Sequence, residues 1–301
     1  MLETIGKAAI LIAFIFCGYM LKQGRLFGRQ SFQTISTIVF TLTLPAAIIV
    51  HLNGMQFDHN LLWISLIAIV CNFILVGLGY LSGHGKMEKS FYMLNMSGFN
   101  IGNFALPFVS YFFDSSAVLV VCLFDAGNSI MCLGIIYGMA SYVYGRNEEN
   151  ILLLLVKTIL SSVPVLTYIV MMALAMFSIS LPSFIVDFAS IPASANTFLS
   201  MLMIGVAVQL NIKKDCLLMI AKTISVRLVG AILLAVAIYF LTAFPDDIKR
   251  VLMILVFSPI AGMACYYTAK LKQDITLSAC INSLQIMISI VVMSLLIVML
   301  S

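Results

Sequence analysis

The sequence predicts an all-α protein that crosses a membrane ten times, and three observations lead to this fold class. Apolar residues make up 62% of the 301-residue chain, whereas charged residues make up only 9%. The mean hydropathy is +1.14. Soluble domains carry about a quarter charged residues, so the composition indicates an integral membrane protein. The third observation is that the apolar residues fall into ten runs of about 20, the length that one helical crossing needs.

Only short polar connections separate these runs. The longest clearly polar one runs from Gly145 to Asn150, so we expect no soluble domain. The first run has neither a basic leader nor a small-residue cleavage site, and we expect it to be a span rather than a cleaved signal peptide. The predicted spans are 4–22, 31–51, 61–82, 91–113, 116–144, 155–178, 186–210, 216–243, 250–270 and 275–300.

The basic residues of the loops predict the orientation. The loops after the odd-numbered spans hold ten Lys and Arg residues, and the opposite side holds only three. By the positive-inside rule the odd loops are cytoplasmic and both termini are exterior, in the plasma membrane or, in a bacterium, the inner membrane. The net charge of +4 comes from these loops, and no nucleic-acid partner is expected. The ten are Lys22, Arg25, Arg29, Lys86, Lys89, Arg146, Lys213, Lys214, Lys270 and Lys272; the three are Lys7, Lys249 and Arg250.

The two halves of the chain show a repeat in their prolines. Pro45 and Pro192 are 147 residues apart, and Pro107 and Pro259 are 152 apart. Five spans per half is an odd number, so the halves would insert with opposite topology, which is the inverted-repeat plan of many secondary transporters. The first predicted repeat is 1–150 and the second is 151–301.

Two of the predicted spans contain helix-breaking residues at membrane depth. The segment from Asn95 to Pro107 reads N-M-S-G-F-N-I-G-N-F-A-L-P, and the segment from Ser258 to Ala264 reads S-P-I-A-G-M-A. Proline removes an N–H and clashes with the carbonyl four residues earlier, which for Pro107 belongs to Asn103. Two interpretations stay open: interrupted helices that form a substrate site, or proline-kinked helices that pack through small residues. The candidate substrate-binding residues are Asn100, Gly102, Asn103, Pro107, Pro259 and Gly262.

Charged residues inside the predicted spans are few, and two stand out. Asp125 lies about ten residues into 116–144, and Asn128 follows one turn later on the same helix face. Arg227 lies at a similar depth in 216–243. An intramembrane carboxylate is a functional hypothesis, here coupling to protons or sodium, against the alternative of a structural ion pair. Arg227 could instead face a cavity and attract an organic anion.

A polar stripe follows one face of the last span, at Ser278, Asn282, Gln285 and Ser289. Such a stripe either borders a cavity or forms hydrogen bonds to neighbouring helices. Lys222 lies near a cytoplasmic span end, where we expect its long side chain to reach out to the membrane surface.

Other chemistry has little support in the sequence. The seven cysteines are scattered singly, with no C-x-x-C pair and no histidine at ligand spacing, so neither a metal site nor a disulfide is indicated. No phosphate-binding loop, nucleophile elbow or H-E-x-x-H motif occurs. We therefore expect no enzyme and no cofactor.

The segment from Asn100 to Pro107 resembles the N-x-G-x-x-G-x-P signature of the auxin efflux carrier family, which holds the plant PIN-FORMED carriers and many bacterial transporters of small carboxylic acids. Ala105 stands where that family usually has glycine, and Met263 stands near the position of an asparagine in the ninth span. The resemblance implies a scaffold of spans 1, 2, 6 and 7, often dimerising, and a moving domain of spans 3–5 and 8–10 in which spans 4 and 9 cross. Asn100, Gly102, Pro107 and Pro259 match this crossing, and Asn128 is a weaker match.

These observations predict a secondary transporter that moves a small organic acid anion by alternating access, with an elevator-like movement. Its partners would be a small carboxylate, the lipid bilayer and, through the scaffold, a second copy of the chain. One alternative is a sodium or proton antiporter of similar plan. Another is a membrane sensor that keeps the fold without transporting, which the departures at Ala105 and Met263 favour.

Overall fold

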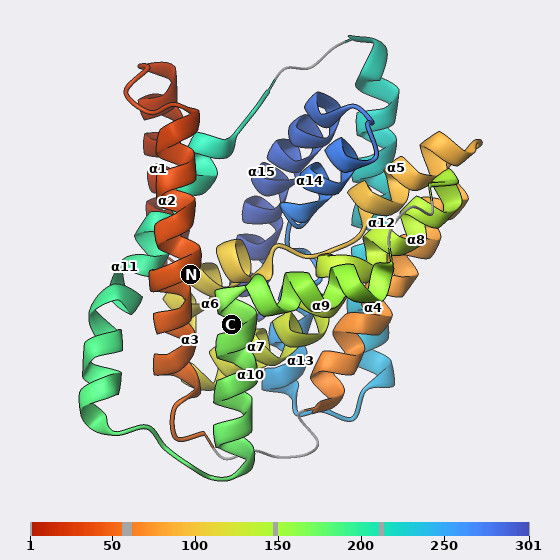
Figure 1. Cartoon of the computed structure of the whole chain (residues 1–301). Coiled ribbons are helices and arrows are strands. Elements are labelled where there is room, and N and C mark those ends of the chain that lie inside the picture. Colours follow the sequence, from red (N-terminus) through yellow and green to blue (C-terminus); the bar gives the residue numbers. More distant parts are fainter. Residues whose placement is uncertain (1, 56–61, 147–149, 211–213, 301) are drawn as a thin grey trace.

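The computed structural model describes residues 2–55, 62–146, 150–210 and 214–300. Within these ranges the structure consists of helices and their connections and contains no strand (Figure 1). The elements are α1 (Leu2–Gln23), α2 (Arg29–Ile38), η1 (Val39–Thr43), α3 (Leu44–Leu52), α4 (Leu62–Ser82), α5 (Lys86–Met96), η3 (Ile101–Ala105), α6 (Leu106–Phe112), α7 (Ser115–Ile130), η4 (Met131–Ile135), α8 (Ile136–Tyr144), α9 (Ile151–Ser161), α10 (Val163–Met176), α11 (Ser183–Ala207), η5 (Lys214–Cys216), α12 (Leu217–Leu241), α13 (Asp246–Leu255), α14 (Met263–Lys270) and α15 (Ile275–Leu300).

Seven helices in the described part of the chain are long and apolar enough to cross a membrane, or eight if one bent pair counts as a single span. They coincide with seven of the ten predicted spans, and they indicate a membrane-embedded helical protein. The seven are Ile5–Gln23, Gln30–Leu52, Leu62–Ser82, Ser115–Tyr144, Ser183–Ala207, Leu217–Leu241 and Ile275–Leu300.

The predicted span 155–178 is not one straight helix. It is the bent pair of α9 and α10, whose axes differ by 82°. Ser162 between them has an extended conformation, and Pro164 occupies the first turn of α10. Proline has no N–H to donate to the preceding turn, so the helix ends before it and begins again in a new direction. Figure 1 shows α9 running across the face of the bundle.

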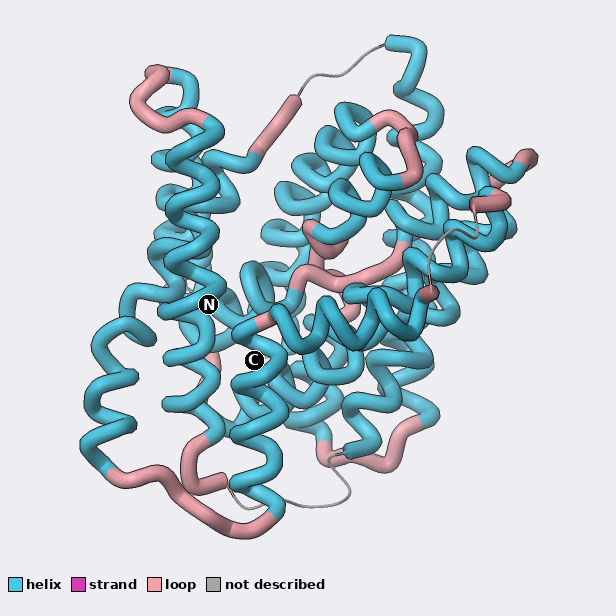
Figure 2. The backbone as a smooth tube through the Cα atoms, viewed as in Figure 1, coloured by secondary structure: helices cyan, strands magenta, loops and turns pink. Residues whose placement is uncertain are grey.

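The predicted spans 91–113 and 250–270 are each two short helices with non-helical residues between them. We call these residues the first break (97–100, between α5 and η3) and the second break (256–262, between α13 and α14). Figure 2 shows both breaks as loops in the interior of the bundle. Length and composition alone do not assign either pair as a membrane span.

The first break lies earlier than the proline rule predicts. Gly98 has φ = +74°, a left-handed conformation that glycine adopts without steric cost. Pro107 lies instead in the first turn of α6, a position where its missing N–H is tolerated. The π-helical turn η3 precedes it, and its N–H groups bond five residues back, as from Ala105 to Asn100. The glycine and not the proline therefore produces the interruption.

One group of helices packs closely around α11. Helices α1 and α3 both contact α11, and α10 contacts α3, on the left and lower centre of Figure 1. Small residues permit this approach: a Cβ on Gly205 would lie 2.0 Å from the Ile15 carbonyl oxygen, and one on Gly18 would lie 2.3 Å from that of Leu202. Helices α4, α5, α7, α8 and α12 to α15 make up the other side of the bundle.

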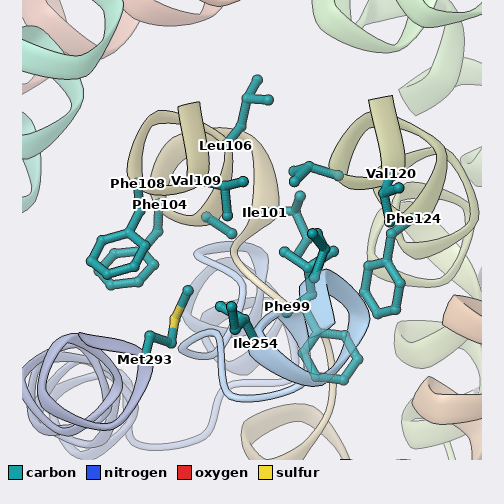
Figure 3. Close-up of a cluster of buried hydrophobic side chains, with 14 of the residues drawn as sticks. Phe99, Ile101, Phe104, Leu106, Phe108, Val109, Val120, Phe124, Ile254 and Met293 are labelled. Carbon is teal, nitrogen blue, oxygen red and sulfur yellow. The ribbon is translucent and has the colours of Figure 1, made fainter. Parts of the chain in front are cut away.

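The helix that follows the first break is buried among its neighbours. Figure 3 shows the rings of Phe104 and Phe108 side by side, with Met293 of α15 next to them and Phe124 of α7 on the far side of the same cluster. The rings of Phe104 and Phe108 stack with centroids 5.9 Å apart. The broken helix thus lies inside protein, the surroundings in which irregular backbone persists at membrane depth.

Helix α7 begins with a side-chain cap outside the apolar segment. The Asp114 carboxylate accepts hydrogen bonds from the Ser116 hydroxyl (2.6 Å) and the backbone N–H of Ala117 (3.2 Å). These bonds favour the ionised form and hold the pKa of Asp114 below its usual range.

Candidate functional site

The two breaks touch each other. The backbone N–H of Asn100 donates a hydrogen bond of 2.8 Å to the carbonyl oxygen of Pro259. A Cβ on Gly98 would lie 3.2 Å from the Cβ of Ala261, tighter than an ordinary contact. Two segments 159 residues apart in the sequence, from 100 to 259, therefore meet backbone to backbone. Only a glycine at position 98 allows this approach without displacement.

Two asparagine side chains hold the backbone of the first break. The Gly98 N–H donates to Asn72 Oδ1 (2.8 Å). The Phe99 N–H donates to Asn128 Oδ1 (3.0 Å), and Asn128 Nδ2 donates back to the Phe99 carbonyl oxygen (2.8 Å). These amides replace bonds that a continuous helix would supply, since an unsatisfied buried N–H or carbonyl is costly. Asn72 was not predicted, although it is the lone amide in the apolar run I-A-I-V-C-N-F-I-L-V.

Asp125 lies beside the helix that begins after the first break. Its Oδ1 accepts from Asn128 Nδ2 (3.1 Å), and its Oδ2 accepts from the Tyr168 hydroxyl (3.2 Å). A Cβ on Gly102 would lie 3.4 Å from Asp125 Oδ2 and 3.1 Å from the Leu44 side chain. Asp125 is 6% exposed. Its two hydrogen-bond donors, the Asn128 amide and the Tyr168 hydroxyl, are both neutral. Tyr168 was not predicted, since no pattern in its own span marks it.

Arg227 binds both breaks at once. Its guanidinium donates to the carbonyl oxygens of Met96 (2.5 Å), Gly98 (2.9 Å) and Ser258 (2.9 Å). It also lies 5.1 Å from the centroid of the Phe99 ring, and the residue is only 2% exposed. Arg227 and Asp125 are both described, and no ion pair within 4 Å joins them. The buried positive charge is satisfied by backbone carbonyls.

Other predicted residues at the crossing have free hydrogen-bonding capacity. Asn103 Oδ1 is buried and has no hydrogen-bond partner. The Asn100 side chain is half-buried and forms no hydrogen bond to any residue that the structure describes. Gly262 is exposed, with open space where a Cβ would lie. These groups can receive a ligand without breaking an existing hydrogen bond. Pro107 differs from them, because it lies in the first turn of α6, after the break, and is buried.

The polar stripe of α15 divides into two parts. At one end the Ser278 hydroxyl donates to Asn95 Oδ1 (2.5 Å), and Asn95 Nδ2 donates to Thr268 Oγ1 (3.1 Å), which joins α15, α5 and α14. Farther along, Gln285 and Ser289 line a cavity. Each of the two interpretations of the stripe therefore applies to one part of it.

The cavity lies beside Arg227, between α12, α15 and the second break. It is small, with room for about one water molecule. Ser258 Oγ and Gln285 Nε2 are both buried and without a hydrogen-bond partner. The lining residues are Arg227, Leu228, Ala231, Val256, Phe257, Ser258, Gln285, Ile288, Ser289 and Val292.

Lys222 has a more specific contact than the sequence suggested. Its Nζ donates to the Ser82 carbonyl oxygen at the end of α4 (2.5 Å), so it caps a neighbouring helix.

Among the described residues, no group of three or more His, Cys, Asp or Glu side chains could hold a metal ion, and the seven cysteines are free.

No protein-family model matches the chain, and no curated protein matches it. The resemblance to the auxin efflux carriers therefore rests only on the Asn100–Pro107 motif and on the arrangement of the predicted spans.

Proposed function

We propose that the protein is a secondary transporter that moves a small organic acid anion across the plasma membrane by alternating access. The observation that carries this proposal is the hydrogen bond from Asn100 to Pro259, with the free amide of Asn100 and the unpaired Asn103 Oδ1 beside it. Broken helices that meet inside a bundle and leave polar groups unpaired are the form that substrate sites take in many secondary transporters.

The chemistry of the crossing favours an anion with a carboxylate. Helical segments begin at Ile101 and Met263, directly after the two breaks, and helix N-termini carry partial positive charge. The Asn100 amide can donate a further hydrogen bond to a carboxylate oxygen. Arg227 adds a full positive charge on the other side of the first break.

The proposed movement separates two groups of helices. The scaffold would consist of α1–α3 and α9–α11, and the transport domain of α4–α8 and α12–α15. Each domain would combine spans from both inverted repeats, 1–150 and 151–301. Two contacts between these groups involve the site itself: the Tyr168 hydroxyl on Asp125 and the Leu44 side chain against Gly102. A second copy of the chain is proposed to bind through the scaffold.

Uptake into proteoliposomes tests the proposal. The purified protein is reconstituted and supplied with a panel of labelled monocarboxylates, dicarboxylates and indole acids. Asn100→Ala should reduce uptake of the transported acid severalfold, because the ligand loses a hydrogen-bond donor. Asn150→Ser, which changes an exposed helix cap, should leave uptake unchanged. Absence of flux for every acid in the panel, with protein that remains folded, contradicts the proposal.

A cation antiporter is a second candidate, and Asp125 is the observation that favours it. A buried carboxylate held by neutral donors can accept a proton or bind sodium. A pH-dependent sodium or lithium flux that Asp125→Asn abolishes, without flux of any acid, would assign the protein to this class. A folded protein with neither flux would favour the membrane sensor.

A further inference from the structure

The carbonyl groups around Arg227 form a site for a cation. Met96 ends α5, an eleven-residue helix, and Ser258 follows α13, a ten-residue helix. The C-terminal end of a helix carries roughly half a negative charge, and the Met96 carbonyl oxygen is the last of α5. The Gly98 carbonyl oxygen of the first break points at the same guanidinium. The single positive charge of Arg227 therefore lies among three backbone carbonyl oxygens, one of them at a helix end.

We propose that the crossing contains a monovalent-cation site that the chain fills with its own Arg227 guanidinium. In transporters with broken helices, unwound carbonyls and half-helix C-termini coordinate sodium ions. Here the same kind of ligand set is occupied by a side chain that is 2% exposed and makes three hydrogen bonds to it. When the side chain is shortened, a free cation of guanidinium type takes its place.

The cavity beside Arg227 adjoins this site. Ser258 and Gln285 line the cavity and carry buried polar atoms without partners. An incoming cation would lose its bound water molecules and gain the carbonyl oxygens and the Ser258 hydroxyl as ligands. The space that the arginine side chain leaves is continuous with the cavity, because Arg227 itself is part of the lining.

The consequence for coupling rests on the proposed transport function. Because a tethered cation occupies the carbonyl site at all times, the crossing needs no sodium ion to neutralise its helix ends. Transport by the unaltered protein is then independent of sodium at this position. A variant without the arginine acquires a requirement for an external cation.

Chemical rescue of purified Arg227→Ala tests the cation site without any transport assay. The substitution should lower the thermal unfolding midpoint by several degrees, and millimolar guanidinium or methylguanidinium should restore most of the loss. Urea at equal concentration has the same shape without the charge and should restore nothing. Arg250→Ala removes an exposed arginine of α13 and should show neither the loss nor the recovery. Failure of both guanidinium ions to raise the midpoint of folded Arg227→Ala overturns the proposal.

The unaltered protein supplies a second test, which holds even if Arg227→Ala does not fold. At constant ionic strength its unfolding midpoint should be the same in sodium, potassium and choline chloride. Stabilisation by sodium alone that persists in Asp125→Asn, which lacks the other candidate sodium ligand, shows that a sodium ion still binds the crossing and overturns the proposal. Stabilisation that Asp125→Asn abolishes places the ion at Asp125 and leaves the carbonyl site to Arg227. Failure of the proposed function has a different signature, since it abolishes acid flux in proteoliposomes while the rescue by guanidinium persists.

Discussion

Truncation of two asparagines near the first break should affect the free energy of unfolding very differently. Asn128 is 2% exposed and bonds the N–H and carbonyl of the buried Phe99, and it also donates to Asp125. Asn128→Ala leaves the Phe99 N–H without a partner, whereas the Phe99 carbonyl keeps the bond from the Ile101 N–H (3.0 Å). An orphaned buried donor costs about 1–3 kcal/mol. The lost bond to Asp125 adds about 1 kcal/mol, so we expect a total loss of about 2–4 kcal/mol.

Asn103→Ala is the matched control. Asn103 Oδ1 has no hydrogen-bond partner, so removing this side chain should change the free energy of unfolding by less than about 0.5 kcal/mol. The assay is reversible denaturant unfolding in mixed micelles, with helicity followed by circular dichroism for both variants. Equal losses for Asn128→Ala and Asn103→Ala, or no loss for Asn128→Ala, would refute the assignment of Asn128 as the support of the break.

Three further predictions concern packing, the contact between helix groups and pH. Gly205→Val should destabilise the protein by at least about 2 kcal/mol, because a Cβ there would lie 2.0 Å from a backbone oxygen; Gly6→Val, with open space at its Cβ, should leave the unfolding midpoint unchanged. Tyr168→Phe removes one hydrogen bond to Asp125 and should cost about 1 kcal/mol, and a double-mutant cycle with Asp125→Asn should be non-additive. Asp114→Ala should cost about 1 kcal/mol at neutral pH. The depressed pKa of Asp114 gives stability that is present above the unfolded pKa near 4 and is lost as pH falls through the folded value. The unaltered protein and Asp114→Ala should therefore have the same stability in strong acid. A difference in stability between them that does not change with pH would contradict the capping role.

Much of the fold could be predicted from hydropathy, because a membrane span needs a long apolar run whatever its neighbours are. The runs 4–22 and 275–300 both lie close to helices of the structure. The position of the first break was less predictable. Several residues between Asn95 and Pro107 can interrupt a helix, and only the contact with the second break shows that Gly98 takes the left-handed conformation.

The candidate site was predictable only where one residue violates the composition of its own span. Asp125, Asn128 and Arg227 are such residues, and all three lie beside the first break. Their partners could not be predicted, because carbonyl groups such as that of Ser258 are not encoded by side-chain type. Tyr168 reaches Asp125 only through the packing of α10 against α7. The orientation and the inverted repeat stay predictions.

A disulfide between the two breaks tests most directly whether they cross. In a background without native cysteines, Gly98→Cys and Ala261→Cys place two Cβ atoms 3.2 Å apart. This is a few tenths of an ångström below the range of about 3.5–4.5 Å in disulfides, so the small displacement that a side chain at position 98 requires brings the two Cβ atoms into that range. Mild oxidation should protect both thiols from a maleimide label, and a reductant should restore labelling, whereas Gly98→Cys alone should be labelled throughout. Full labelling of the folded double variant after oxidation would show that the two breaks do not meet.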